Sequence, residues 1–169
     1  MTTENKHIVK VMGSAIEIKS KPETIWEHIT NVKIEQFSDP VVFKLLGIPK
    51  PLKAEVMSEG TGGKRIAYFD SGKKFMQEIL VWKPFTEYSF AFNPEKGFRV
   101  CYFFELSAGV FQIPFGAYYL STNGQTTTLQ LTTTYSIDRR LYFLFNIPAR
   151  IILKAFQRYL LTSIKKNAE

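Results

Sequence analysis

The feature that most constrains the fold is a run of short apolar segments between residues 52 and 137, each bounded by a turn signal. The strongest signal is the Asn123-Gly124 pair, because a tight hairpin turn needs positive φ at its central residues. Short connections leave no room for crossover helices, so consecutive strands must pair antiparallel. We predict strands over residues 52–58, 64–69, 73–82, 86–93, 113–121 and 125–137.

The residues before this run predict one more strand and two short helices. A strand is expected over 6–18, and the SKPE sequence that follows is typical of a helix start, with Ser20 and Glu23 forming a capping box. That helix should end near Ile29. A second short helical piece, broken at a proline, is expected over 34–46.

The C-terminal segment predicts one long helix over 139–167. Pro148 should either kink this helix or restart it, with Asn146 as the new cap. The spacing of Arg150 and Lys154 defines a solvent-facing side. If the sheet covers the apolar face, only this charged stripe is left outside.

The composition fits a single domain over residues 1–169. The chain is 45% hydrophobic, and its length lets it bury roughly 70% of its unfolded surface. One cysteine, Cys101, excludes an internal disulfide, and two histidines argue against a histidine-built metal site. We expect no metal and no cofactor. Because the N-terminus lacks a signal core and no segment approaches roughly eighteen apolar residues, we expect a cytoplasmic protein.

The net charge of +7 raises the question of whether the protein binds an anionic partner. The basic residues are dispersed and form no nucleic-acid motif, so we expect no nucleic-acid partner. A weak electrostatic contact with an anionic membrane surface stays open. The GTGG run before Lys64 and Arg65 lacks the Gly-Lys-Ser/Thr ending of a phosphate-binding loop and is predicted to be a turn.

Three segments carry a family resemblance: IEIKSKPETIWEHIT (16–30), QEILVWKPFTEYSFAF (77–92) and TTTLQLTTTYSI (126–137). In this order they resemble the helix-grip (START/SRPBCC) superfamily, which includes START lipid-transfer domains, birch-pollen-allergen proteins and polyketide cyclase/dehydrase-like proteins. The resemblance implies an α+β fold. Its curved antiparallel sheet of about seven strands grips the long C-terminal helix, with two short helices after the first strand. Such a sheet and helix leave an internal cavity between them.

Strand alternation identifies the side chains that should face this cavity. Tyr88, Phe90 and Phe92 alternate with small or polar residues and should point inward. A four-residue loop at 83–86 would pair these residues with Val81, Ile79 and Gln77, whereas a loop one residue longer would turn Glu78 inward. The sequence leaves both registers open. In the last strand, alternation predicts that Tyr135 points inward. The residues on the same face are Leu129, Leu131, Thr133 and Ile137.

The candidate ligand-binding residues come from the inward strand positions, tyrosines with a hydroxyl to offer, and the buried helix face. They are Tyr68, Gln77, Glu78, Phe90, Phe92, Tyr119, Tyr135, Ile152 and Phe156. We predict that the cavity binds a hydrophobic small molecule or lipid. The alternative, which the resemblance permits, is a polyketide cyclase/dehydratase-type enzyme with Glu78, Glu105 or a tyrosine as its acid or base. A third hypothesis is an interaction module whose aromatic side chains fill the interior.

The sequence leaves two further questions open. The aromatic-rich segment 98–111 is either a strand or a loop that gates the cavity. Neither the oligomeric state nor the identity of the ligand follows from the residues.

Overall fold

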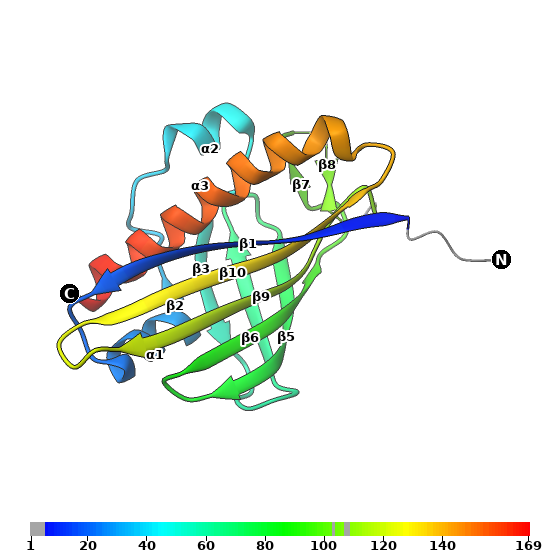
Figure 1. Ribbon diagram of the computed structural model, residues 1–169. Coiled ribbons are helices and arrows are strands. Elements are labelled where there is room, and N and C mark those ends of the chain that lie inside the picture. Colours follow the sequence, from blue (N-terminus) through cyan, green and yellow to red (C-terminus); the bar gives the residue numbers. More distant parts are fainter. Residues whose placement is uncertain (1–5, 103, 107–108) are drawn as a thin grey trace.

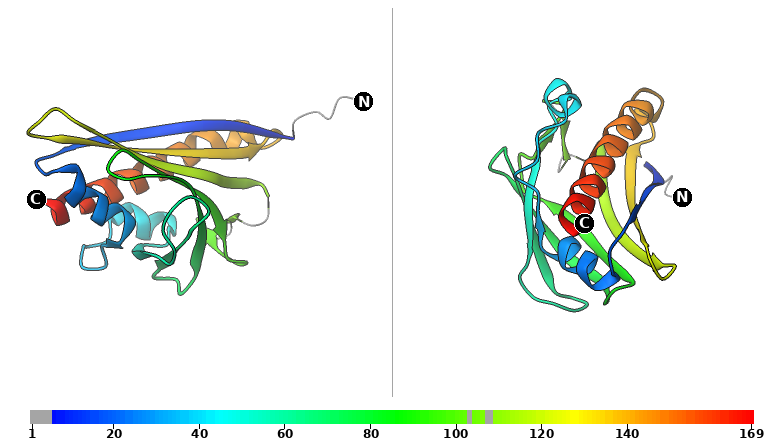
Figure 2. Two further views of the ribbon diagram at one scale, coloured as in Figure 1. Left: turned by 90° about the horizontal axis from the view of Figure 1, so that it is seen from below. Right: turned by 90° about the vertical axis from the view of Figure 1, so that its left-hand side faces the viewer.

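The computed structural model describes residues 6–102, 104–106 and 109–169. Its main feature is an eight-stranded antiparallel sheet that curls around one long helix, α3 (Figures 1 and 2). The strand order is β1-β10-β9-β6-β5-β4-β3-β2. The strands are β1 (His7–Ile18), β2 (Val32–Lys33), β3 (Pro51–Val56), β4 (Lys64–Phe69), β5 (Lys74–Lys83), β6 (Glu87–Pro94), β9 (Phe111–Thr122) and β10 (Thr127–Asp138).

This architecture confirms the predicted α+β fold with its curved sheet and terminal helix. The six strands of the predicted run are present, and the GTGG residues form the turn before β4. The Asn123-Gly124 pair lies in the connection of the β9–β10 hairpin. The sheet also gains β2, a short strand that pairs with β3 through Val32 and Ala54.

The two short helices follow β1 as expected, but the predicted capping box is wrong. Helix α1 (Pro22–Thr30) begins one residue later, with Lys21 at its N-cap and no side-chain capping bond. The Ser20 carbonyl instead accepts a 2.8 Å hydrogen bond from the Thr127 hydroxyl. Helix α2 (Val41–Leu46) ends at Gly47, whose φ of 58° belongs to the left-handed region that glycine adopts at little cost.

Helix α3 (Tyr142–Ala168) is a single helix that contains Pro148. The helix does not restart at Pro148, and the Asn146 side chain accepts a 3.0 Å hydrogen bond from the Tyr135 hydroxyl. The expectation of a purely charged outer stripe is wrong for its first turns, where Phe143 is 90% exposed and Ile147 is 66% exposed. Within the described chain, no helix is both long and apolar enough to cross a membrane.

A buried glutamine fixes α3 against the sheet. Gln157 is 1% exposed, and its amide nitrogen donates to the Met12 carbonyl and the Thr133 hydroxyl, at 3.1 and 2.8 Å. Its amide oxygen accepts a 2.7 Å hydrogen bond from the Ser14 hydroxyl. The helix is therefore tied to β1 and β10 by directional bonds as well as by apolar packing.

The β5–β6 pairing decides the register that the sequence left open. Gln77 pairs with Phe92 and Ile79 with Phe90, so the shorter register holds at this end of the hairpin. A bulge between Ile79 and Val81 then shifts the pairing, and Val81 faces Ser89 rather than the expected tyrosine. An extra residue in one strand displaces every pair beyond it, which simple alternation does not foresee.

The segment 98–111, expected to be either a strand or a gating loop, contains short strands. A small separate hairpin is formed by β7 (Arg99–Val100) and β8 (Phe104–Glu105), and Phe111 already belongs to β9. Residues 103, 107 and 108 of this segment lie outside the described residues.

Candidate functional site

A cavity of about 150 Å³ lies between the curled sheet and α3. It lies where three clusters of buried side chains meet, so its wall combines residues from each: Phe90 and Leu131 from the first, Ala67 from the second, and Leu153 from the third. Aromatic side chains make up much of the wall. They are Phe69, Phe75, Phe90, Phe92, Phe98, Phe111, Tyr118, Phe145 and Phe156.

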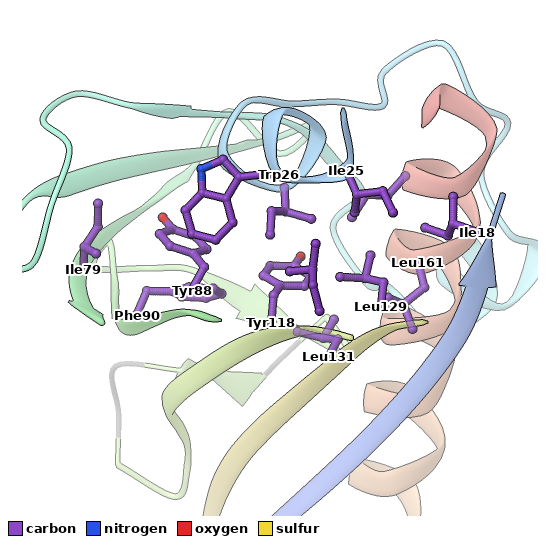
Figure 3. Packing of buried hydrophobic residues seen from close by; sticks show 13 residues of the cluster. Ile18, Ile25, Trp26, Ile79, Tyr88, Phe90, Tyr118, Leu129, Leu131 and Leu161 are labelled. Atoms are coloured by element: carbon purple, nitrogen blue, oxygen red, sulfur yellow. The ribbon is translucent and has the colours of Figure 1, made fainter. Parts of the chain in front are cut away.

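The first of these clusters closes one end of the sheet, where α1 packs across it (Figure 3). Trp26 of α1 is 8% exposed, as expected for a core residue, and its ring meets Tyr88 edge-on at 6.0 Å between centroids. Tyr88 in turn lies 5.3 Å from Phe90, which lines the cavity. Ring contacts thus connect Trp26 through Tyr88 to Phe90 of the cavity wall.

Five of the nine candidate ligand-binding residues line the cavity. They are Gln77, Phe90, Phe92, Ile152 and Phe156. Gln77 is 3% exposed and faces inward because it belongs to the same side of β5 as two buried apolar residues, Phe75 and Ile79. The structure therefore brings β5, β6 and α3 together as the alternation of side chains predicted.

The other four candidates, Tyr68, Glu78, Tyr119 and Tyr135, do not line the cavity among the described residues. Glu78 is exposed, because the register turns its neighbour Gln77 inward. Tyr119 is 40% exposed for the same reason, since its neighbour Tyr118 takes the inward position.

Tyr68 and Tyr135 are engaged elsewhere. Tyr68 lies on the outward-alternating positions of β4, with the Lys53 ammonium 5.0 Å from its ring centroid. Tyr135 does face the helix and is 2% exposed, but its hydroxyl is bonded to Asn146. An inward tyrosine near the end of a strand has found a structural partner, so its hydroxyl is not offered to a ligand.

Arg65, which is not among the predicted ligand-binding residues, lines the cavity from β4 and is 3% exposed. One guanidinium nitrogen donates to Gln77 Oε1 at 3.1 Å, and the other donates to the Ile29 carbonyl at 2.8 Å. The available signal was alternation, because Arg65 shares its side of β4 with the buried Ala67 and Phe69. A charged residue at such a position is normally assigned to the outer face, and the lysine next to it concealed the pattern.

Two tyrosines near Arg65 are held in their neutral form. Burial raises the pKa of Tyr118 to about 12, and the nearby Arg65 guanidinium only partly opposes this shift. Burial also raises the pKa of Tyr88, again against the effect of Arg65. Both phenols are therefore available near neutral pH as hydroxyls and not as phenolate bases.

Cys101 also lines the cavity, in a left-handed backbone conformation with φ of 53°. Burial raises the pKa of its thiol, which disfavours the reactive thiolate. Among the described residues, the lining contains neither a carboxylate nor a histidine. No group of three metal-ligating side chains comes together in the described part of the chain.

The two acids considered for catalysis lie away from this lining. Glu78 is exposed, and Glu105 accepts a 2.7 Å hydrogen bond from the Gly97 backbone N–H. Near Glu105, the side chains of Phe98, Val100, Cys101 and Leu106 form part of the cavity wall.

No family model matches the chain, and no curated protein matches it in sequence. Solved structures do match. Norcoclaurine synthase from Thalictrum flavum, in complex with dopamine and hydroxybenzaldehyde, superposes with a TM-score of 0.57 at 14% identity, over 95% of this chain and 87% of the other. The protein XoxI from Bacillus cereus gives 0.58 at 11% identity over 94% of both chains.

The structure of Ara h 8.0201 gives a TM-score of 0.56 at 11% identity, over 95% of this chain and 98% of the other. These similarities extend along nearly the whole chain while few residues are shared, so they concern the fold. Together with the curled sheet around α3, they show that this protein has the helix-grip fold that its sequence resembles.

Proposed function

We propose that the protein binds a small apolar molecule in the cavity between its sheet and α3. The observation that carries this proposal is the cavity itself, about 150 Å³ in volume and walled mainly by aromatic and aliphatic side chains. An engineered apolar cavity of about 150 Å³ in another protein admits a molecule such as benzene. Burial of the apolar surface of a ligand would stabilise the complex by roughly 25 cal/mol per Å².

The volume favours a ligand with about one ring over a long-chain lipid. Pockets for drug-sized molecules usually span about 300–1,000 Å³, which exceeds this cavity severalfold. The norcoclaurine synthase complex supports the same size class, because both of its named ligands are single-ring aromatics. A larger guest would need the wall to open, and besides α3 the described wall outside the main sheet includes Val100 of β7 and the adjacent Cys101.

Binding is favoured over acid–base catalysis by the chemistry of the lining. The described cavity residues offer no carboxylate or imidazole, and the raised pKa of Tyr118 keeps its phenol from acting as a base near neutral pH. A general base matched to neutral pH is thus missing from the described wall. The aromatic rings do not fill the interior, which argues against a purely structural module.

The proposal is tested by titrating the protein with toluene and indole while following backbone amide chemical shifts. We expect saturable shifts at cavity residues. Ala67→Leu adds three carbons to a cavity-lining position and should weaken binding at least tenfold. Ala91→Leu makes the same change at a β6 position outside the described lining and should leave binding unchanged. Absence of saturable binding, or equal effects of the two variants, would refute the proposal.

We also propose that the first turns of α3 rest on an anionic membrane surface. Phe143, Leu144, Ile147 and Ile151 are each more than half exposed there, an unusual arrangement for apolar side chains. Exposed Arg139, Arg140, Arg150 and Lys154 come from the same region and supply the positive charge that anionic headgroups attract.

Sedimentation with vesicles tests this contact. The protein should pellet with phosphatidylserine-containing vesicles and stay free with vesicles of phosphatidylcholine alone. Phe143→Ser combined with Ile147→Ser should abolish pelleting, whereas Val9→Ser combined with Val11→Ser removes exposed apolar side chains from β1 and should not. Equal behaviour of the two double variants would exclude α3 as the contact surface.

A further inference from the structure

Arg65 is a buried cation without an acidic partner in residues 6–102, 104–106 and 109–169. The other buried cation of this part of the chain, Lys50, is paired with Asp39 at 3.0 Å. A buried charge without a counter-charge is costly unless something else compensates it. The question is therefore whether the groups around Arg65 compensate its charge.

The contacts of Arg65 hold the guanidinium in place but supply no full negative charge. Gln77 Oε1 and the Ile29 carbonyl accept one hydrogen bond each. The second of these belongs to the last turn of α1, where the helix carries only a partial negative charge. The rings of Tyr88 and Phe90 lie 5.5 and 5.6 Å from the guanidinium carbon and contribute cation–π attraction.

Two buried side-chain atoms in the described chain lack a hydrogen-bond partner, and they belong to neighbouring residues. They are Arg65 Nε and the Tyr88 hydroxyl. Arg65 Nε–H can only donate a hydrogen bond, whereas the Tyr88 hydroxyl can both donate and accept, and the neighbouring guanidinium acts on Tyr88 as a hydrogen-bond donor. Buried polar groups in native proteins are nearly always paired, which makes incomplete pairing beside a buried cation informative.

Arg65 lines the cavity, so an acceptor carried by a ligand can reach it. The other cation on the wall, Lys53, is 41% exposed at its side chain and already paired with Glu55 at 2.9 Å. The positive charge that a ligand meets inside the apolar enclosure is therefore that of Arg65.

We propose that the ligand carries a carboxylate, which pairs with the guanidinium of Arg65 while its apolar body lies among the rings of Phe90 and Phe92. This inference rests on the proposed function, that the cavity holds a small apolar molecule. A planar carboxylate matches the planar fork of guanidinium N–H groups. A phosphate would add a second negative charge and a tetrahedral headgroup to a small apolar cavity that offers one buried cation.

The test compares benzoate with nitrobenzene, which has the same shape and no net charge. Both are titrated into the full chain at pH 7 by calorimetry, with amide chemical shifts to locate binding. Native protein should bind benzoate at least tenfold more tightly than nitrobenzene, because only benzoate pairs with Arg65.

The variant Gln77→Glu separates charge recognition from folding. It keeps the guanidinium and its bond to α1 and places a carboxylate on the atom that already accepts from Arg65 at 3.1 Å. That carboxylate should neutralise the guanidinium charge and weaken benzoate binding at least tenfold more than nitrobenzene binding, so the ratio of the two affinities reports charge recognition. Met76→Glu adds the same charge at an exposed position of the same strand and should change neither ligand.

The outcomes distinguish the two proposals. If nitrobenzene binds at least as tightly as benzoate, or if Gln77→Glu leaves benzoate binding intact, the carboxylate inference is wrong and the apolar cavity stands. If neither probe binds, the cavity is not a site for single-ring ligands and both proposals fall. Selective loss of benzoate in Gln77→Glu supports both.

Discussion

The rings of Phe90 and Phe92, which line the cavity, occupy the space where a side chain at Gly116 of β9 would lie. Replacing Gly116 by alanine should therefore displace both rings. A methyl group there would lie 2.9 Å from the nearest carbons of both Phe90 and Phe92. Carbon atoms in good contact are about 3.5–4.0 Å apart, so each ring must give way by roughly 0.5–1 Å. Overpacking of this kind costs about 1–3 kcal/mol of folding free energy.

Gly13→Ala of β1 is the matched control. Its added carbon would lie 3.4 Å from the nearest atom, Gln130 Nε2, which is an ordinary contact. Both substitutions restrict the unfolded chain equally, so their difference in stability isolates the clash at Gly116. In a protein of this size, 1–3 kcal/mol lowers the melting temperature by about 2–10 °C.

Thermal and urea denaturation of both variants measure the difference, and toluene titration reports on the cavity. Gly116→Ala should be the less stable variant and should bind toluene more weakly, because displaced rings take up cavity space. If Gly116→Ala matched Gly13→Ala in stability and kept native toluene affinity, the packing described around Phe90 and Phe92 would be wrong.

Two further predictions concern buried polar groups. The folded-state pKa of Tyr118 lies at about 12, above its unfolded value of about 10. The contribution of the neutral Tyr118 side chain to the free energy of unfolding is therefore complete below pH 10 and is lost as the pH rises toward 12. Native protein should therefore lose about 1 kcal/mol more stability between pH 9 and 11 than Tyr118→Phe, measured by urea denaturation, with exposed Tyr119→Phe as the control. Gln157→Leu leaves a β1 carbonyl and the Thr133 hydroxyl without their partner and should cost about 1–3 kcal/mol, whereas exposed Arg158→Leu should cost little. Equal urea midpoints for these last two variants would show that the amide does not hold α3 in place.

The inward faces of the strands could be predicted because side-chain alternation is a local property. Tyr88 and Phe90 are buried as expected, and so are Leu129, Leu131 and Ile137 of β10. Each strand needs only its own sequence to reveal this pattern. The element order could be predicted for the same reason, because a turn residue affects the backbone only within a few positions along the chain.

The polar part of the site could not be predicted because its contacts cross the fold. Arg65 is bonded to Gln77, twelve residues away on the next strand, and to Ile29, thirty-six residues away at the end of α1. No local pattern reveals such partners, and without them a strand arginine is assigned to solvent. Glu78 illustrates the opposite case, since a choice between two registers separated by one residue decided its exposure.

The pairing of β1 with β10 has a consequence for synthesis of the protein. Ile18 pairs with Thr127 and His7 with Asp138, so β1 is synthesised well before its partner strand β10. Chains grow at about 5–20 residues per second, which leaves β1 without its neighbour for on the order of ten seconds. During that time the segment His7–Ile18 has apolar side chains and unpaired backbone groups exposed. Chaperones bind segments of this kind, and such segments also pair in aggregates. The sheet is completed when β10 emerges and closed when α3 docks, so most of the fold's cooperativity is expected to arrive with the last quarter of the chain.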